Sequence, residues 1–388
     1  MSNRSEKTMR NISRLMSSLT VLTLTASLAA CGGGGTSTTN TTGTTGNGTT
    51  GTTGEARTVP LAGNVALTGA GASFPAPLYQ NWFVQLNQEV PQLQVNYQSV
   101  GSGAGVEQFT QGTIDFGASD VAMKDEEIAK IKNGVILLPM TAGSIAVAYN
   151  LPGVEGLKLS RDVYVGIFDG TITKWNDPKI VAANPDLKLP DSPITVVHRA
   201  DGSGTTGVFT KHLSAISPEW KKGIGEGKTV QWPTSKGKFI GGKGNEGVTA
   251  ALQQNEGTIG YIEYGYAKNN NIAMAALENS AGKFVLPDET SAAATLASEP
   301  LPDDLRLFIS DPAGENAYPI VTYSWMLVNK NYPDKNKAIA VEAMIEYGLT
   351  TGQQQSAALG YVPLPPEVVK KVAAAADQIT PDYTIKVE

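Results

Sequence analysis

Residues 65–90 read VALTGAGASFPAPLYQNWFVQLNQEV, and this stretch decides the fold class. Residues 65–68 form a short apolar run that is typical of a strand, and residues 76–90 have the spacing of an amphipathic helix. A loop of mostly small residues, 69–74, joins the two. A strand that enters a helix through a short loop is the repeating unit of α/β proteins, so the stretch predicts an α/β fold.

The same alternation continues along the chain. Further strands are expected at 93–98, 114–117, 135–139, 144–149, 194–198 and 258–262, and a long apolar run lies at 320–328. Further helices are expected at 105–111, 124–132, 160–168, 206–215, 246–255, 336–348 and 366–375. This order predicts mostly parallel sheets covered by helices.

Composition excludes several classes of protein. The 388 residues suggest two or three domains, or one large two-lobed domain, and an apolar content of 41% is enough for a sizeable core. One cysteine and two histidines exclude a disulfide framework and argue against a metal site rich in these residues. We therefore expect no metal or other cofactor. A net charge of −6 argues against nucleic-acid binding.

The N-terminus has the pattern of an export signal. Four basic residues precede a mostly apolar run at 15–30, which is too short and too polar for a comfortable membrane span. The run ends Leu28-Ala29-Ala30-Cys31, which resembles a bacterial lipobox, so we expect a signal peptide at 1–30 and a lipid on Cys31. The alternative is an ordinary cleavage site followed by an incidental cysteine. Loss of 1–30 removes four basic residues and one acidic residue, which changes the net charge from −6 to −9.

A low-complexity segment follows the cysteine. Residues 32–54 are only Gly, Thr, Asn and Ser, a composition that cannot form a packed core. We expect residues 31–59 to be a flexible tether.

Four loops of small residues follow expected strands and precede helices or helix-like turns. They are 69–74 (GAGASF), 101–105 (GSGAG), 117–120 (GASD) and 201–207 (DGSGTTG). Backbone N–H groups at a helix N-terminus favour an anion, and glycine allows it to approach closely. Any one loop is more simply a tight turn with a helix cap. Four of them at the carboxyl ends of strands favour an anion site.

Two nucleotide-binding patterns are incomplete. Residues 202–207 match the dinucleotide fingerprint Gly-x-Gly-x-x-Gly, but no expected strand ends in an acidic residue about 20 positions later. Residues 237–243 match a P-loop until Gly244, which stands where Ser or Thr should hold the metal.

Three charged residues lie beside these loops. The planar guanidinium of Arg199 suits two oxygens of a tetrahedral oxyanion, although a structural salt bridge is the plain alternative. Asp120 repels a fully deprotonated anion but accepts a hydrogen bond from one that carries a proton, as phosphate does near neutral pH and sulfate does not. It could also simply cap the next helix. Asp201 either holds Arg199 or shapes its turn.

At these residues the sequence resembles the substrate-binding proteins of phosphate ABC importers. The resemblance rests on residues 67–77, 115–120 and 199–205, and on 172–177, 241–247 and 257–264, in order along the chain from about residue 65. It implies a type II periplasmic-binding-protein fold of two lobes that close around one ligand, joined by two crossings near 149–151 and 318–322. The first lobe would be 60–149 plus 320–388, and the second would be 150–319.

The resemblance also implies a ligand set. The first lobe would contribute Ser73, Phe74 (through its backbone N–H), Ser102 and Asp120, and the second would contribute Arg199, Ser203, Gly204 and Thr205. Asp201 would orient Arg199. Ser73 stands where the family often has Thr, which keeps the hydroxyl. His198 stands where a second arginine can occur, but an outward-facing strand position is the simpler interpretation.

The implied function is high-affinity, extracytoplasmic binding of inorganic phosphate (HPO4 or H2PO4) and its delivery to ABC permease subunits. We expect a monomer that contacts the membrane only through its lipid. The alternatives are a receptor for sulfate or molybdate, and a tethered phosphate sensor or buffer that is not coupled to transport. A metal phosphatase would need more histidines, and neither Ser102 nor Ser203 lies in a Gly-x-Ser-x-Gly elbow, so we expect no enzyme.

Overall fold

A computed structural model describes residues 57–387. The expected signal peptide at 1–30, Cys31 and the expected tether as far as residue 56 lie outside the described residues. Residues 57–59, which the sequence assigned to the tether, pack on the folded unit. Arg57 pairs with Glu346, and its guanidinium lies over the ring of Tyr347.

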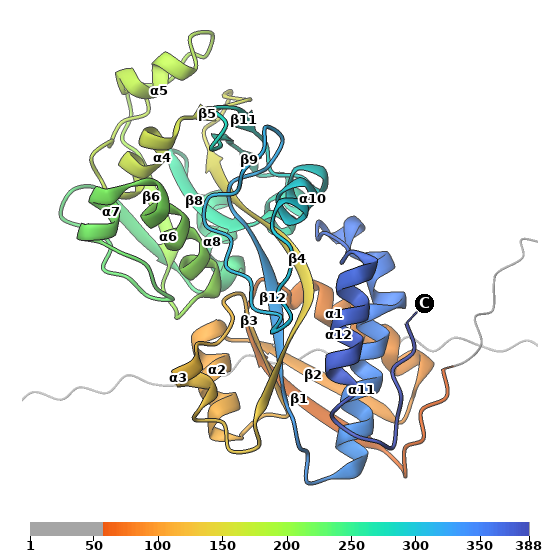
Figure 1. Ribbon diagram of the computed structural model, residues 1–388. Helices are drawn as coiled ribbons and strands as arrows, with labels where there is room; N and C mark the ends of the chain where they lie inside the picture. The colour runs from red at the N-terminus through yellow and green to blue at the C-terminus, as the bar shows by residue number, and fades with distance from the viewer. Residues whose placement is uncertain (1–56, 388) are drawn as a thin grey trace, which may run out of the picture. The chain divides into compact units, whose positions relative to one another are not determined.

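Nine strands in the described part of the chain form one long sheet in the order β2-β1-β3-β12-β4-β8-β6-β7, with β9 paired to β4. Its two halves carry the two lobes of an α/β fold, as the sequence predicted (Figure 1). The sheet is mixed rather than mostly parallel, because β12 and β4 run antiparallel to their neighbours. The first half contains β1 (Val65–Gly71), β2 (Leu93–Ser99), β3 (Phe116–Ser119) and β12 (Val321–Asn329). The second contains β6 (Thr195–Arg199), β7 (Lys238–Gly242), β8 (Thr258–Glu263) and β9 (Ala273–Met274).

One strand, β4 (Val135–Asn150), connects the halves. It pairs with β12 as far as Ser144 and with β8 from Ile145 onward, so the chain crosses between lobes inside this strand rather than near 149–151. The sequence predicted two strands here, 135–139 and 144–149, which is wrong. The register with β12 shifts beside Pro139, and such a bulge lets a strand accommodate a proline that has no N–H. The chain returns near Ile320, whose carbonyl accepts the N–H of Ile145 at 2.8 Å.

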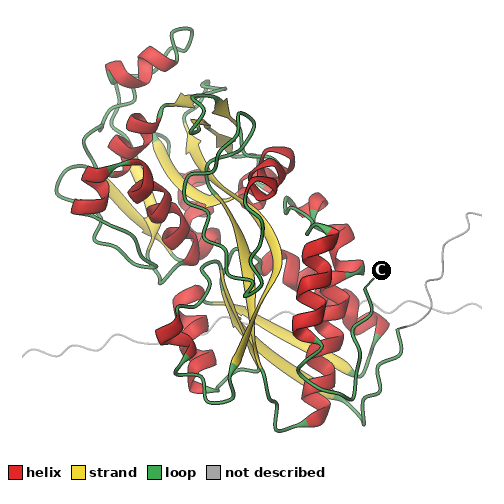
Figure 2. Cartoon of the chain, in the orientation of Figure 1, coloured by secondary structure: helices red, strands yellow, loops and turns green. Residues whose placement is uncertain are grey.

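Helices cover both faces of the sheet (Figure 2). The first lobe carries α1 (Ala76–Glu89), α2 (Ser102–Gln111), α3 (Asp125–Ile128), α11 (Lys335–Leu349) and α12 (Pro366–Ala376). The others are α4 (Arg161–Phe168), α5 (Pro178–Ala183), α6 (Gly204–Ile216), α7 (Pro218–Gly223), α8 (Gly244–Gln254), α9 (Tyr264–Asn269) and α10 (Glu289–Ser298). A small separate sheet contains β5 (Lys158–Leu159), β10 (Ala276–Glu278) and β11 (Phe284–Val285). Within residues 57–387, no helix is long and apolar enough to cross a membrane.

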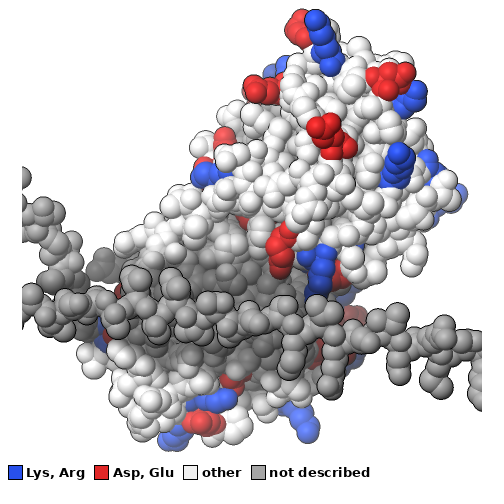
Figure 3. Space-filling model, turned by 180° about the vertical axis from the view of Figure 1, so that it is seen from behind, with Lys and Arg blue, Asp and Glu red and all other residues white. Residues whose placement is uncertain are grey.

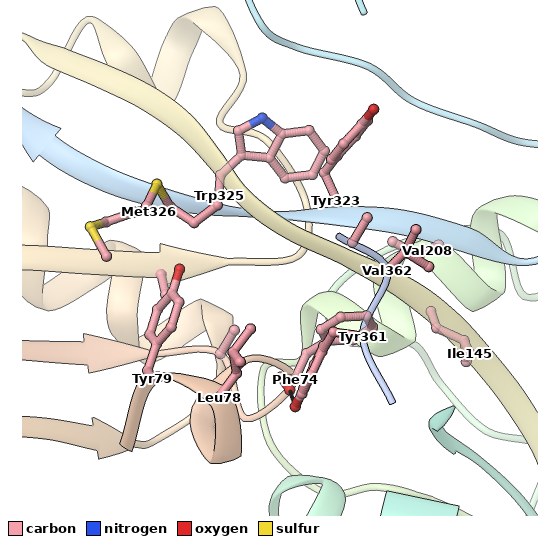
Figure 4. Close-up of a cluster of buried hydrophobic side chains, with 14 of the residues drawn as sticks. Phe74, Leu78, Tyr79, Ile145, Val208, Tyr323, Trp325, Met326, Tyr361 and Val362 are labelled. Atoms are coloured by element: carbon pink, nitrogen blue, oxygen red, sulfur yellow. Dashed lines mark hydrogen bonds between the residues drawn. The ribbon is translucent and has the colours of Figure 1, made fainter. Parts of the chain in front are cut away.

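Figure 4 shows a cluster of buried side chains in which aromatic rings pack among aliphatic residues. Phe74 and Tyr361 pack with ring centroids 6.1 Å apart, and Trp325 is buried on β12. The indole N–H of Trp325 donates to the carbonyl of Leu305 at 2.7 Å, and Arg306 pairs with Asp125 of α3. The loop around residue 305 therefore packs on the first lobe, although its position in the sequence placed it in the second.

Close packing of α2 on β1 fixes the loop at residues 101–105. A Cβ at Gly105 would overlap the Cα of Gly71 and lie 2.9 Å from the carbonyl oxygen of Ala70. Only glycine fits there without a shift of backbone.

We expect Gly105→Ala to lower the free energy of unfolding by about 1–3 kcal/mol, because the new methyl group meets rigid backbone. Chemical denaturation measures the change. Gly223→Ala on α7 is the matched control, since nothing lies within 4 Å of a Cβ there. Equal stability of both variants and the unmodified protein would contradict this packing.

Candidate oxyanion site between the lobes

The expected ligand residues come together between the two lobes. Ser73 and Phe74 follow β1, Ser102 begins α2 and Asp120 follows β3, while Arg199 ends β6 and Ser203, Gly204 and Thr205 lie at the start of α6. All eight are buried. Parallel strands that end at the same edge of a sheet bring their following loops together, which explains the convergence within each lobe.

The lobes touch at the site. The N–H of Gly103 donates to the carbonyl of Gly202 across the interface at 2.7 Å. A Cβ at Gly204 would lie 2.8 Å from the backbone nitrogen of Asp120. The glycines of these loops therefore permit a backbone approach that other residues would block.

A two-pronged ion pair holds Arg199. Its Nε and Nη2 donate to the two carboxylate oxygens of Asp201 at 2.8 and 2.6 Å, and the arginine side chain is only 1% exposed. Burial alone would raise the pKa of Asp201, but the hydrogen bonds and charge of Arg199 and the N–H of Gly244 hold that pKa below its ordinary value. The remaining nitrogen, Nη1, points to the hydroxyl of Thr205 at 3.3 Å. The cation is thus fixed with one edge directed at the converging residues.

Asp120 is a buried acceptor. Its Oδ1 accepts the hydroxyl of Ser324 at 2.9 Å, and its Oδ2 accepts that of Thr205 at 3.2 Å. Burial raises the pKa of Asp120 to about 6, although Ser324, Arg199 and Thr205 each lower it. A largely apolar cavity of about 370 Å³ adjoins this residue, with Val208, Phe308 and Trp325 among its walls. Asp120 is therefore a carboxylate near neutral pH and becomes a hydrogen-bond donor in mild acid.

The remaining expected residues contribute hydroxyls and backbone. Ser203 caps α6, because its Oγ accepts the N–H of Thr206 at 3.0 Å, which leaves its proton to donate. The Oγ of Ser102 accepts the N–H of Asp120 at 3.3 Å. His198 stacks on Trp232, and its Nδ1 lies 2.8 Å from the carbonyl oxygen of Arg199, so its side chain does not join the group.

Sequence reasoning missed three residues that hold this group in place. Tyr261 accepts the N–H of Arg199, Ser324 binds Asp120, and Asn245 donates to Ser73. Asn245 and Tyr261 lie in segments that carried the family resemblance, but nothing in the sequence around them indicated that they hold the site residues in place. Ser324 had only a weak signal, since it is one of two aliphatic hydroxyl residues, with Thr322, in a mostly apolar run.

Local groups rather than bulk charge would attract an anion here. Figure 3 shows basic and acidic side chains interspersed over the face that it displays. Within residues 57–387, no cluster of three or more His, Cys, Asp or Glu is placed to hold a metal ion. Oriented N–H groups, hydroxyls and one arginine can bind an oxyanion without a metal.

We expect Ser324→Ala to raise the pKa of Asp120 further above 6, because the carboxylate loses a hydrogen-bond donor. An NMR titration of side-chain carboxyl carbons measures the shift. Thr322→Val is the control, since that hydroxyl donates to the backbone carbonyl of Asp120 rather than to its carboxylate. An unchanged pKa in Ser324→Ala, or the same rise in both variants, would contradict this role.

Comparisons with known proteins identify the family and the fold. The family model of the PBP superfamily domain matches residues 35–350. "Phosphate-binding protein PstS" of Haemophilus influenzae is 43% identical over 319 residues, which cover 81% of this chain and 93% of that one. The protein of the same name from Methanocaldococcus jannaschii is 40% identical over 328 residues, or 79% and 84% of the two chains. In fold, the chain is similar to a high-affinity periplasmic phosphate-binding protein, PfluDING, solved with phosphate (TM-score 0.66, 21% identity, 80% and 93% coverage).

Proposed function

Because the chain belongs to the PBP superfamily and, within it, to the PstS phosphate-binding proteins, we propose that it binds inorganic phosphate between its lobes and delivers it to an ABC permease. One observation carries the choice of ligand. A buried arginine and a buried carboxylate that accepts hydrogen bonds face the same group of hydroxyls. This combination suits an anion that still carries a proton.

The proposed ligands are the eight residues of the converging group. Arg199 donates hydrogen bonds either to two phosphate oxygens or to one oxygen that Thr205 also binds. The other hydrogen-bond donors to phosphate are the hydroxyls of Ser73, Ser102, Ser203 and Thr205 and the backbone N–H groups of Phe74 and Gly204. A carboxylate oxygen of Asp120 accepts a hydrogen bond from the protonated oxygen of HPO4 or H2PO4. Asp201 binds no phosphate and keeps Arg199 in position. Sulfate and molybdate carry no proton near neutral pH, so the carboxylate of Asp120 disfavours them.

Closure of the lobes traps the ligand in this proposal. We place the boundaries at the exchange of partners in β4 near Ser144 and at Ile320, with the loop around residue 305 resting on the first lobe. An ion pair between Lys228 and Glu127 (3.2 Å) and the contact of Gly103 with Gly202 support the closed arrangement.

We also propose that the protein is a monomeric, non-enzymatic receptor outside the cytoplasm, anchored by a lipid on Cys31. The pattern of residues 28–31 and the low-complexity segment that follows it support the export and the lipid anchor.

Calorimetric titration of the full-length protein, stripped of bound phosphate, tests the function and the role of Asp120. We expect one-to-one binding of phosphate and no binding of sulfate at pH 8. Asp120→Asn should keep phosphate binding and gain affinity for sulfate, because the amide can donate to an unprotonated oxygen. In the unmodified protein, sulfate binding should emerge only as the pH falls through about 6, where Asp120 takes up a proton.

Asp115→Asn is the matched control, since that carboxylate binds Lys337 and the N–H of Thr68 outside the site. Sulfate binding by the unmodified protein at pH 8 would contradict the proposal that the site selects phosphate. Unchanged selectivity in Asp120→Asn would remove Asp120 from the recognition of the proton.

Arg199→Ala should weaken phosphate binding by about 2–4 kcal/mol, from the loss of charge-assisted hydrogen bonds in a buried site. Arg161→Ala is the control, because Arg161 also forms a two-pronged pair, through Nη1 and Nη2 with Asp311 at 2.9 and 2.7 Å, away from the site. A loss below about 0.5 kcal/mol, which is less than one net hydrogen bond, would show that Arg199 does not bind the ligand.

A further inference from the structure

Asn245 has a fixed orientation. It lies near the start of α8 in the second lobe and is fully buried. Its Oδ1 accepts the backbone N–H of Glu263 at 3.0 Å. Because a backbone N–H can only donate, the atom that faces it must be the oxygen, and the amide nitrogen must point the other way.

That nitrogen reaches Ser73 of the first lobe. The Oγ of Ser73 accepts two hydrogen bonds from Asn245, one from its backbone N–H and one from its Nδ2, both at 3.0 Å. A serine hydroxyl can accept two hydrogen bonds and donate one. Both acceptor positions of Ser73 are therefore filled, and only its proton is left to interact with a ligand.

The contact crosses between the lobes. Ser73 follows β1 and Asn245 follows β7, and these two strands belong to different halves of the sheet. Tyr266 of α9 adds a third bond across the same interface, from its hydroxyl to the carbonyl of Ser73 at 2.8 Å. When the lobes separate, Ser73 loses these partners, and its hydroxyl is free to accept as well as to donate.

We propose that Asn245 is a positioning residue that makes Ser73 an obligate hydrogen-bond donor when the lobes close, and so prevents the bound phosphate from directing its proton at Ser73. The inference rests on the proposed binding of phosphate. A phosphate oxygen that faces Ser73 can accept a hydrogen bond from its hydroxyl but cannot donate one to it, whereas the oxygen that faces the carboxylate of Asp120 must carry the proton. Ser73 and Asp120 therefore act as a pair, with opposite hydrogen-bond roles that together orient the ligand.

A double-mutant cycle measured by calorimetric titration with inorganic phosphate tests this coupling. The variants of the full-length protein are Asn245→Ala, Ser73→Ala and the double substitution. We expect Asn245→Ala to weaken binding about 10- to 100-fold when Ser73 is present and less than about threefold in the Ser73→Ala background. A merely structural role would produce the same loss in both backgrounds, and that result would overturn the inference.

Asn245→Asp covers the case in which Asn245→Ala fails to fold. This change keeps the shape and the acceptor for Glu263, but it places an oxygen beside Ser73 that takes the serine proton. We expect at least a 100-fold loss of phosphate affinity at pH 8 that becomes smaller as the pH falls and the new carboxyl is protonated. A loss that does not change with pH would contradict the proposal.

The control is Asn279→Ala, since Asn279 is equally buried but donates only to backbone carbonyls around residue 315. Phosphate affinity should not change in this variant once it is folded. Failure of the proposed function and failure of the proposed role of Asn245 give different results. An unmodified protein that does not bind phosphate overturns the proposed function, whereas binding with an additive cycle overturns only the role of Asn245.

Discussion

The buried ion pair between Arg199 and Asp201 organises the second lobe's side of the site. Asp201 accepts two hydrogen bonds from the guanidinium and a third from the N–H of Gly244, at 3.0 Å. It therefore links the end of β6 to the start of α8, where Asn245 lies. Removal of one partner from a buried pair leaves an uncompensated charge, which is costly. The pair fixes both the cation of the site and the helix that reaches across to Ser73.

The two acidic residues of the site differ because their surroundings differ. Asp201 is held ionised by the adjacent cation and by N–H donors, so it is a permanent counter-charge. Asp120 lies beside an apolar cavity and has a pKa of about 6, so it is an acceptor at neutral pH that can become a donor in acid. One acid thus sets the position of the arginine, while the other gives the site its sensitivity to the ligand's proton.

Much of this architecture could be predicted from local sequence. The strand–loop–helix stretch at 65–90 indicated the α/β class, and small residues at the ends of strands indicated where an anion would be bound. What escaped prediction depends on contacts between distant segments. Asn245 acquires its role from Ser73, 172 positions away, and Ser324 acquires its role from Asp120. The continuity of β4 depends on a bulge opposite β12, and β7 has only Phe239 and Ile240 to mark it as a strand.

A crystal structure of the full-length protein with phosphate, grown near pH 8, tests the central claim most directly. The account predicts a tetrahedral ligand with one oxygen about 2.5–2.7 Å from Oδ2 of Asp120, the length of a charge-assisted O–H···O bond. Its other oxygens should lie within hydrogen-bond distance of Arg199 and of Oγ of Ser73. Phosphate bound elsewhere, or bound between the lobes with no oxygen in reach of Asp120, would contradict the account.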